Sequence, residues 1–212
     1  MKNSEKHNFA TPLGILLRAM GDLLVLNLLW LFTAFPIVTM GTASSAVYSV
    51  LLRRDRTGEL PLFKNYFKSF ASGFVHSTLL WLIALVMGFV AVVDIRFALT
   101  FEGTVQYVYL ALGFIIAVSA LIIAFVGIPQ QAYFSNSLIG YIKNSFALVF
   151  VSPARFLLIL IVWAIPVAFL FVFTRQALAR IGVVYFMWGF SAPAYLASHL
   201  LNRIFDKFDI SA

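Results

Sequence analysis

The 212-residue chain contains no cysteine and few charged residues, and both shortages restrict its chemistry. Without cysteine it can form no disulfide, no thiolate metal site and no cysteine nucleophile. Charged residues make up 11% of the sequence, whereas soluble domains average about 25%. Hydrophobic residues make up 62%, which is more apolar surface than a soluble domain of this size can bury.

Catalytic and nucleotide-binding motifs are also missing from the sequence. His7, His76 and His199 are scattered without metal-ligand spacing, and neither a GxSxG motif nor a Walker A motif is present. We therefore expect no enzyme activity, no metal and no cofactor. We also expect no nucleic-acid binding, because the basic residues behind the net charge of +7 cluster between apolar segments, where a membrane explains them better.

Long apolar runs dominate the sequence. Two of them, 74–93 and 107–128, contain no charge and have the roughly 20 residues that a ~30 Å hydrocarbon core requires. The runs are continuous rather than alternating, which favours helices over a β-barrel. The sequence therefore predicts an all-α, polytopic transmembrane helix bundle that forms one domain over residues 1–212. The expected spans, about six, lie at residues 15–35, 37–52, 74–93, 107–128, 156–174 and 181–201.

The first two spans are predicted to form a short helical hairpin around Pro36. Proline disfavours helical geometry at the preceding Phe35, and Gly41 tolerates turn conformations. A turn at 35–41 places twelve of the fifteen Lys and Arg residues on the inner side, whereas one continuous span would place nine there. The second arm, 37–52, reaches only about 24 Å as a helix. The pair is therefore either two full spans or a re-entrant hairpin.

A basic segment follows the hairpin and is expected to be a cytoplasmic loop, by the positive-inside rule. Its basic residues are Arg53, Arg54, Arg56, Lys64 and Lys68. Residues 61–72 place aromatic and basic side chains at helical spacing, as in an amphipathic helix in the membrane interface. A cytoplasmic extension of the span at 74–93 explains the same pattern. Both termini are predicted to be cytoplasmic.

Small and hydroxylated residues gather at the end of the turn and just after it, and they have two interpretations. The residues are Thr39, Gly41, Thr42, Ser44 and Ser45. They suit close packing of helices, because small side chains let backbones approach and hydroxyls bond across the contact. They also suit the lining of a ligand site, as in interrupted helices of transporters.

Two further polar residues lie inside the first apolar run. Asp22 is a candidate functional residue, because carboxylates inside membrane segments usually have a role. An ion pair with Arg18, one turn earlier, explains Asp22 as well. Asn27 is deeper in the run and is predicted to make an interhelical hydrogen bond.

The run NLLWLFTAFPIVTMGTASSAVYSVLL, together with the later FKNYFKSF, resembles the YesL family of bacterial membrane proteins, a domain family of unknown function. The residues that carry the resemblance are Asn27, Leu28, Trp30, Pro36, Thr39, Gly41, Ala46 and Tyr48. It covers roughly residues 13–75. Members are typically encoded beside carbohydrate ABC importers and glycan-degrading enzymes, so the resemblance implies a location in the bacterial plasma membrane and a link to oligosaccharide uptake.

The leading functional hypothesis is a non-enzymatic accessory or interaction component of carbohydrate uptake. Its expected partners are the lipid bilayer, subunits of a carbohydrate ABC importer and a second copy of the chain. The alternative is a small solute transporter or channel-like protein with a pathway lined by Asp22 and by Thr42 to Ser45. An intramembrane enzyme is third, because no acid, base and nucleophile can be assembled from the sequence.

Overall fold

The computed structural model describes residues 12–57, 61–172, 182 and 184–209, and no strand occurs among them. The helical elements are α1 (Pro12–Ala34), the 3₁₀ turn η1 (Ile37–Thr39), α2 (Met40–Thr57), α3 (Leu62–Ala98), α4 (Thr104–Ile122), the π-helical turn η2 (Ile123–Gly127), α5 (Ile128–Gln130), α6 (Leu138–Val151), α7 (Pro153–Val172) and α9 (Ser191–Asp209). A short helical segment also covers 184–188. The all-α prediction is confirmed for this part of the chain.

Three helical stretches are long and apolar enough to cross a membrane: Leu13–Ala34, Leu62–Ala98 and Thr104–Gln130. A fourth candidate consists of Leu138–Val151 and Pro153–Pro166, which meet at an angle of 104°. Large apolar side chains cover the outside of these helices, as lipid-facing surfaces require. The described helices are those of an integral membrane protein with three or four candidate spans, and the predicted six are not confirmed.

The break between α1 and α2 lies where Pro36 predicts it. Pro36 is extended (φ −73°, ψ 118°), and one turn of 3₁₀ helix then leads into α2. The hydroxyl of Thr39 secures the break by donating to the carbonyl oxygens of Thr33 (2.6 Å) and Pro36 (2.8 Å). Of the two parts predicted for Gly41, turn formation and close packing, the structure shows close packing. This glycine lies inside α2, where a Cβ atom would come within 2.4 Å of Trp81 Cβ on α3.

Helix α2 is the buried centre of the fold rather than a lipid-facing span over 37–52. Side chains on several of its faces are inaccessible, including Ala43, Ala46, Val47, Val50 and Leu52. They pack against α1, α3 and α9. Serines and terminal arginines lower the hydropathy of α2, and it is not among the described helices that qualify as spans. Its neighbours, rather than lipid, provide its apolar environment.

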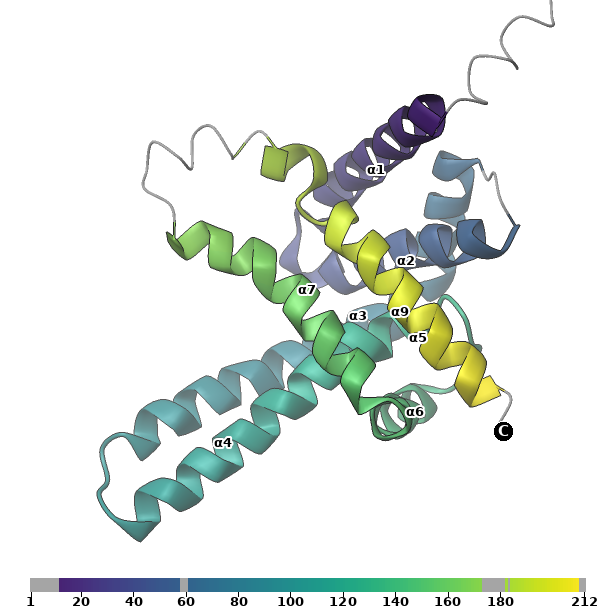
Figure 1. Cartoon of the computed structure of the whole chain (residues 1–212). Helices are drawn as coiled ribbons and strands as arrows, with labels where there is room; N and C mark the ends of the chain where they lie inside the picture. The colour runs from purple at the N-terminus through teal and green to yellow at the C-terminus, as the bar shows by residue number, and fades with distance from the viewer. Residues whose placement is uncertain (1–11, 58–60, 173–181, 183, 210–212) are drawn as a thin grey trace, which may run out of the picture.

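Helix α3 is continuous over 37 residues, so residues 62–72 are its first turns and not a separate interfacial helix. The extension therefore explains the aromatic and basic pattern. At about 1.5 Å per residue, α3 is about 55 Å long, well beyond a ~30 Å hydrocarbon core. It also continues past the predicted end at residue 93. With α4 it forms a hairpin that projects from the other helices (Figure 1), closed by Gly103 at φ 70°.

The C-terminal half departs most from the predicted spans. The span predicted over 156–174 corresponds to α7, which begins at Pro153 and includes Pro166. The span predicted over 181–201 is divided by a turn at Gly189 and Phe190, and α9 begins at Ser191. Pro193 therefore lies in the first turn of a new helix, where its missing N–H is not needed. Residues 173–181 and 183 lie outside the described part of the chain.

Candidate functional site

Helix α2 presents two rows of residues to two separate cavities. Met40, Ser44 and Tyr48 repeat every four residues and line the first cavity. Ser45, Ser49 and Arg53 repeat at the same interval on another face and line the second. Because residues four apart lie on one side of a helix, a single helix forms a wall of both sites. We call them the aromatic cavity and the polar cavity.

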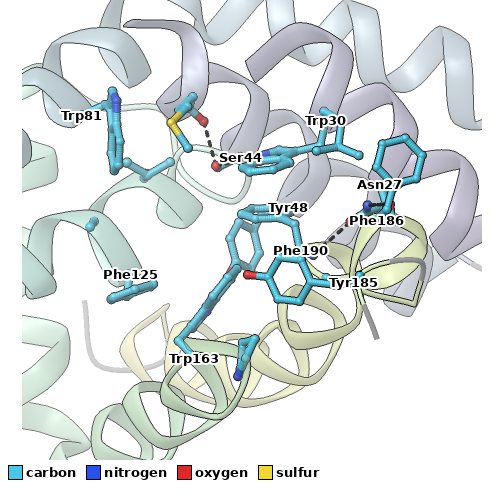
Figure 2. Close-up of a pocket in the computed structure, with 17 residues that line it drawn as sticks. Asn27, Trp30, Ser44, Tyr48, Trp81, Phe125, Trp163, Tyr185, Phe186 and Phe190 are labelled. Carbon is cyan, nitrogen blue, oxygen red and sulfur yellow. Dashed lines mark hydrogen bonds between the residues drawn. The ribbon is translucent and has the colours of Figure 1, made fainter. Parts of the chain in front are cut away.

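The aromatic cavity has a volume of about 460 Å³ and is walled largely by rings (Figure 2). The rings belong to Trp30, Tyr48, Trp81, Phe125, Trp163, Tyr185, Phe186 and Phe190. Trp30 and Phe190 stack with ring centroids 4.1 Å apart, and Trp163 packs on Phe190 at 5.0 Å. The volume lies within the range of about 300–1,000 Å³ that is typical of small-molecule sites.

Hydrogen bonds fix two of the indole rings in place. Trp30 Nε1 donates to Ser44 Oγ (3.1 Å), and Ser44 Oγ donates to the carbonyl of Met40 (2.7 Å). Trp81 Nε1 donates to the carbonyl of Ile37 (2.8 Å) in the turn before α2. These bonds tie α1 and α3 to α2 and its preceding turn, so the aromatic walls are pre-organised by the hairpin.

Asn27 closes one side of the aromatic cavity by joining α1 to the start of α9. It is 1% exposed, and its Nδ2 donates to the carbonyl of Phe186 (2.7 Å). Its Oδ1 accepts from the backbone N–H groups of Phe190 (2.9 Å) and Ser191 (3.0 Å). The predicted interhelical hydrogen bond is therefore present. Two of its partners are backbone N–H groups at the start of α9, where N–H groups have no intrahelical acceptor.

Two buried polar atoms on the wall of the aromatic cavity have no hydrogen-bond partner among the described residues. They are Tyr48 Oη and Trp163 Nε1. The two groups lie near enough to interact, but neither completes a hydrogen bond. Buried polar groups are usually paired, and an unpaired one costs about 1–3 kcal/mol. A ligand atom that accepts hydrogen bonds would satisfy these donors.

The π-helical turn η2 shapes the wall that faces α2. A π-turn inserts an extra residue into a helix and is common at functional sites. Here it separates α4 from α5, and its Ala124 and Phe125 line the aromatic cavity. Its last residue, Gly127, lies against α6, where a Cβ atom would be 2.9 Å from Ser145 Oγ.

The polar cavity lies on the other side of α2 and has a volume of about 230 Å³. Its walls come from α2, from α3, from the segment after α5 and from α6. The lining residues are Ser45, Ser49, Arg53, Ser69, Ser72, Gly73, His76, Gln131, Ala132, Ser135 and Tyr141. Ser49 Oγ and Ser69 Oγ are 2.7 Å apart and join α2 to α3 across it.

A family model described as "Protein of unknown function, DUF624" matches residues 23–95. The match spans the second half of α1, all of α2 and nearly all of α3, which is about a third of the chain. The DUF624 match includes every α1, α2 and α3 residue that lines either cavity. No curated protein and no solved structure matches the chain.

Within the DUF624 match, the structure separates the candidate residues rather than gathering them. Ser44 lines the aromatic cavity and Ser45 the polar one. Thr42 is fully buried between α2 and α3, where its hydroxyl lies 2.9 Å from Thr78 Oγ1. Gly41 serves the same helix contact, and Thr39 secures the turn. The packing interpretation therefore describes Gly41 and Thr42, while the serines also line cavities.

Asp22 is the residue immediately before the DUF624 match, and its side chain has a partner on another helix. Its Oδ2 lies 2.6 Å from Arg54 Nη1 of α2, and the two side chains are 25% and 28% exposed. The ion pair shown thus joins α1 to the end of α2, whereas the prediction named Arg18. Asp22 lines neither of these two cavities, and the pathway lined by Asp22 with Thr42 to Ser45 stays a prediction.

The five basic residues also have different surroundings. Arg53 lines the polar cavity, and Arg54 pairs with Asp22. Lys64 and Lys68 are exposed on the first turns of α3. For Arg56 the structure describes the backbone but not the side chain.

Sequence reasoning missed three features of these sites. The first is Gln130, which is fully buried and donates to Ser145 Oγ (2.7 Å), joining α5 to α6. The second is the polar row on α3, where Ser69, Ser72, Gly73 and His76 follow helical spacing within the sequence. The third is the aromatic cavity, whose rings come from six separate segments. The spacing on α3 was readable in advance; the assembly of distant rings was not.

Proposed function

We propose that this protein is an integral membrane accessory component of carbohydrate uptake in the bacterial plasma membrane, without enzyme activity of its own. Its binding site is the aromatic cavity, and the observation that carries this proposal is the pair of unpaired donors, Tyr48 and Trp163, within aromatic walls. Support for the uptake role comes from the resemblance of residues 13–75 to the YesL family. The cavity residues of α1, α2 and α3 lie within or beside that segment.

The chemistry of the cavity selects an apolar ligand with a single accepting oxygen. Aromatic faces and methylene groups provide most of the wall, and they favour planar or aliphatic bodies. A free sugar suits the cavity poorly, because each hydroxyl buried without a partner costs about 1–3 kcal/mol. In this proposal the transported oligosaccharide passes through the importer, and the aromatic cavity holds an apolar or aryl-linked molecule.

Isolation at natural abundance tests the uptake role. The tagged protein, expressed from its own promoter during growth on an oligosaccharide, is extracted from native membranes and its partners are identified by mass spectrometry. We expect importer subunits to copurify in stoichiometric amounts. Recovery of the protein without any importer subunit contradicts the accessory role. A second tag on another copy reports self-association in the same extract.

Ligand binding at the aromatic cavity is tested with anisole, which joins a planar apolar ring to a single accepting oxygen. We expect it to raise the unfolding temperature of the purified protein, whereas glucose does not. Trp163→Phe and Tyr48→Phe keep an aromatic ring but remove one donor, and each should weaken the effect. Tyr195→Phe is the matched control, because Tyr195 is an exposed tyrosine outside this cavity. Equal effects of all three variants contradict the assignment.

A small transporter is the second candidate, favoured by the broken helices at Pro36 and at the 104° bend between α6 and α7. Purified protein in sealed vesicles should then carry solute, and Ser45→Ala should reduce the flux. Flux equal to that of empty vesicles excludes this candidate and leaves the accessory role standing.

A further inference from the structure

The polar cavity is rich in hydrogen-bond donors and has no carboxylate among its described lining residues. Arg53 contributes a guanidinium group and His76 an imidazole. Five serine hydroxyls complete the polar lining, from Ser45, Ser49, Ser69, Ser72 and Ser135. A lining with a permanent positive charge and many donors favours an anion, because charge-assisted hydrogen bonds are the strongest available to it.

Gln131 contributes an amide side chain to the lining of this cavity. Its Oε1 accepts a hydrogen bond from Ser77 Oγ (2.8 Å), which fixes the orientation of the amide. Its Nε2 is a buried donor that has no partner among the described residues. Because such donors are rarely left unpaired, the Gln131 amide indicates a ligand that accepts hydrogen bonds.

Gly73 keeps the cavity open between α2 and α3. A Cβ atom at this position would lie 3.3 Å from Ser77 Oγ and 3.8 Å from Ser45 Oγ. The glycine thus leaves room for an atom beside two hydroxyls. The volume of about 230 Å³ is below the range of drug-sized sites, which is about 300–1,000 Å³. A small anionic group fits the polar cavity better than a whole cofactor.

We propose that the polar cavity binds a phosphate group, either of a small phosphate-bearing solute or of an anionic phospholipid headgroup. The guanidinium of Arg53 matches the geometry of phosphate oxygens. Serine hydroxyls and the Gln131 amide donate to the remaining oxygens. This site is independent of the aromatic cavity, because the two share no lining residue.

Calorimetric titration of the full-length protein in phosphate-free maltoside micelles tests this site and identifies the source of the phosphate. One arm uses inorganic phosphate, a second uses short-chain dioctanoyl phosphatidylglycerol, and a third uses glucose as a neutral polar solute. We expect saturable binding of one phosphate-bearing probe per protein. Binding in the first arm identifies a free phosphate ligand, and binding confined to the second identifies a lipid headgroup.

Variants then locate the binding. Arg53→Gln should weaken it about tenfold or more, the loss expected for a charge-assisted contact. Gly73→Ala adds one methyl group and should also weaken it without altering charge. Lys68→Gln is the matched control, because Lys68 is an exposed cation of α3 that does not line the cavity. It should change the affinity less than twofold.

Three results overturn the proposal. The first is that neither phosphate-bearing probe binds, which means that the polar cavity holds only water. The second is an equal loss in Arg53→Gln and Lys68→Gln, which indicates non-specific attraction to a basic surface. The third is glucose binding that Arg53→Gln leaves unchanged, which assigns the cavity to a neutral solute.

Discussion

Replacing Asn27 with alanine should destabilise the protein more than the loss of any exposed amide. The side chain makes three hydrogen bonds across the fold, to the carbonyl of Phe186 and to the N–H groups of Phe190 and Ser191. Asn27→Ala removes all three and leaves those backbone groups without their partner. It also detaches α1 from the first turn of α9.

The size of the effect follows from the number of bonds and from their burial. Hydrogen bonds between membrane helices average about 0.6 kcal/mol, so three of them set a lower value of about 2 kcal/mol. An unsatisfied buried backbone group costs about 1–3 kcal/mol, which raises the expected loss to about 3–4 kcal/mol. Asn27→Asp should fall between the wild type and alanine. Its carboxylate still accepts from two N–H groups at a helix start but repels the carbonyl of Phe186.

Unfolding in mixed micelles by increasing SDS, followed by far-UV circular dichroism, measures these losses. Asn65→Ala is the control, since the Asn65 amide makes one local bond to Pro61, four residues away. It should change the free energy of unfolding by less than about 1 kcal/mol. If Asn27→Ala and Asn65→Ala differ by less than 1 kcal/mol, the Asn27 bonds do not hold α1 to α9.

Two further predictions concern the hairpin. Gly41→Ala should lower the free energy of unfolding by about 1–3 kcal/mol in the same SDS assay, because the new methyl group overlaps Trp81. Gly21→Ala is the control, since no atom lies within 4 Å of its new Cβ, and it should be neutral or slightly stabilising. Similar losses in both variants would contradict the close-contact role of Gly41. The natural chain has no cysteine, so single cysteines report its topology in intact cells: one at Thr39 should react with an impermeant thiol reagent added outside, and one at Thr57 should not, whereas the reverse labelling contradicts the predicted orientation.

The sequence predicted the hairpin because its signal is local. Pro36 restricts the residue before it, and the break occurs there. The outcome for Gly41 shows the limit of such reasoning, because a glycine can serve a turn or a close contact. Which of the two applies depends on whether another helix lies against it. Here Trp81, forty residues later in the chain, decides the matter.

The number of spans was harder to predict because hydropathy does not distinguish lipid from protein as the surroundings of an apolar helix. Helix α2 has the apolar run of a span, yet neighbouring helices bury it. The run 181–201 is apolar as well, but Asn27 binds the backbone at its centre, where the turn before α9 lies. Contacts 163 and 164 residues apart in sequence lie outside any local pattern.

The candidate sites were predicted in part. The hydroxyl-rich segment was expected to line a ligand site or to pack, and its members do both, divided between two faces of α2. The partner of Asp22 was taken from its own helix, since one-turn spacing is all that a sequence displays. The structure shows Arg54, which the turn at Pro36 brings back beside α1.

The tryptophans of the aromatic cavity have a practical consequence. The chain has four tryptophans, and three of them, Trp30, Trp81 and Trp163, line this cavity. The fourth, Trp188, lies outside the lining, where its Nε1 donates to the carbonyl of Met20 (3.0 Å). The intrinsic ultraviolet emission of the unlabelled protein therefore comes mainly from the walls of one site. A ligand that enters the aromatic cavity should change this tryptophan emission, so a library of compounds can be screened by fluorescence without any engineered probe.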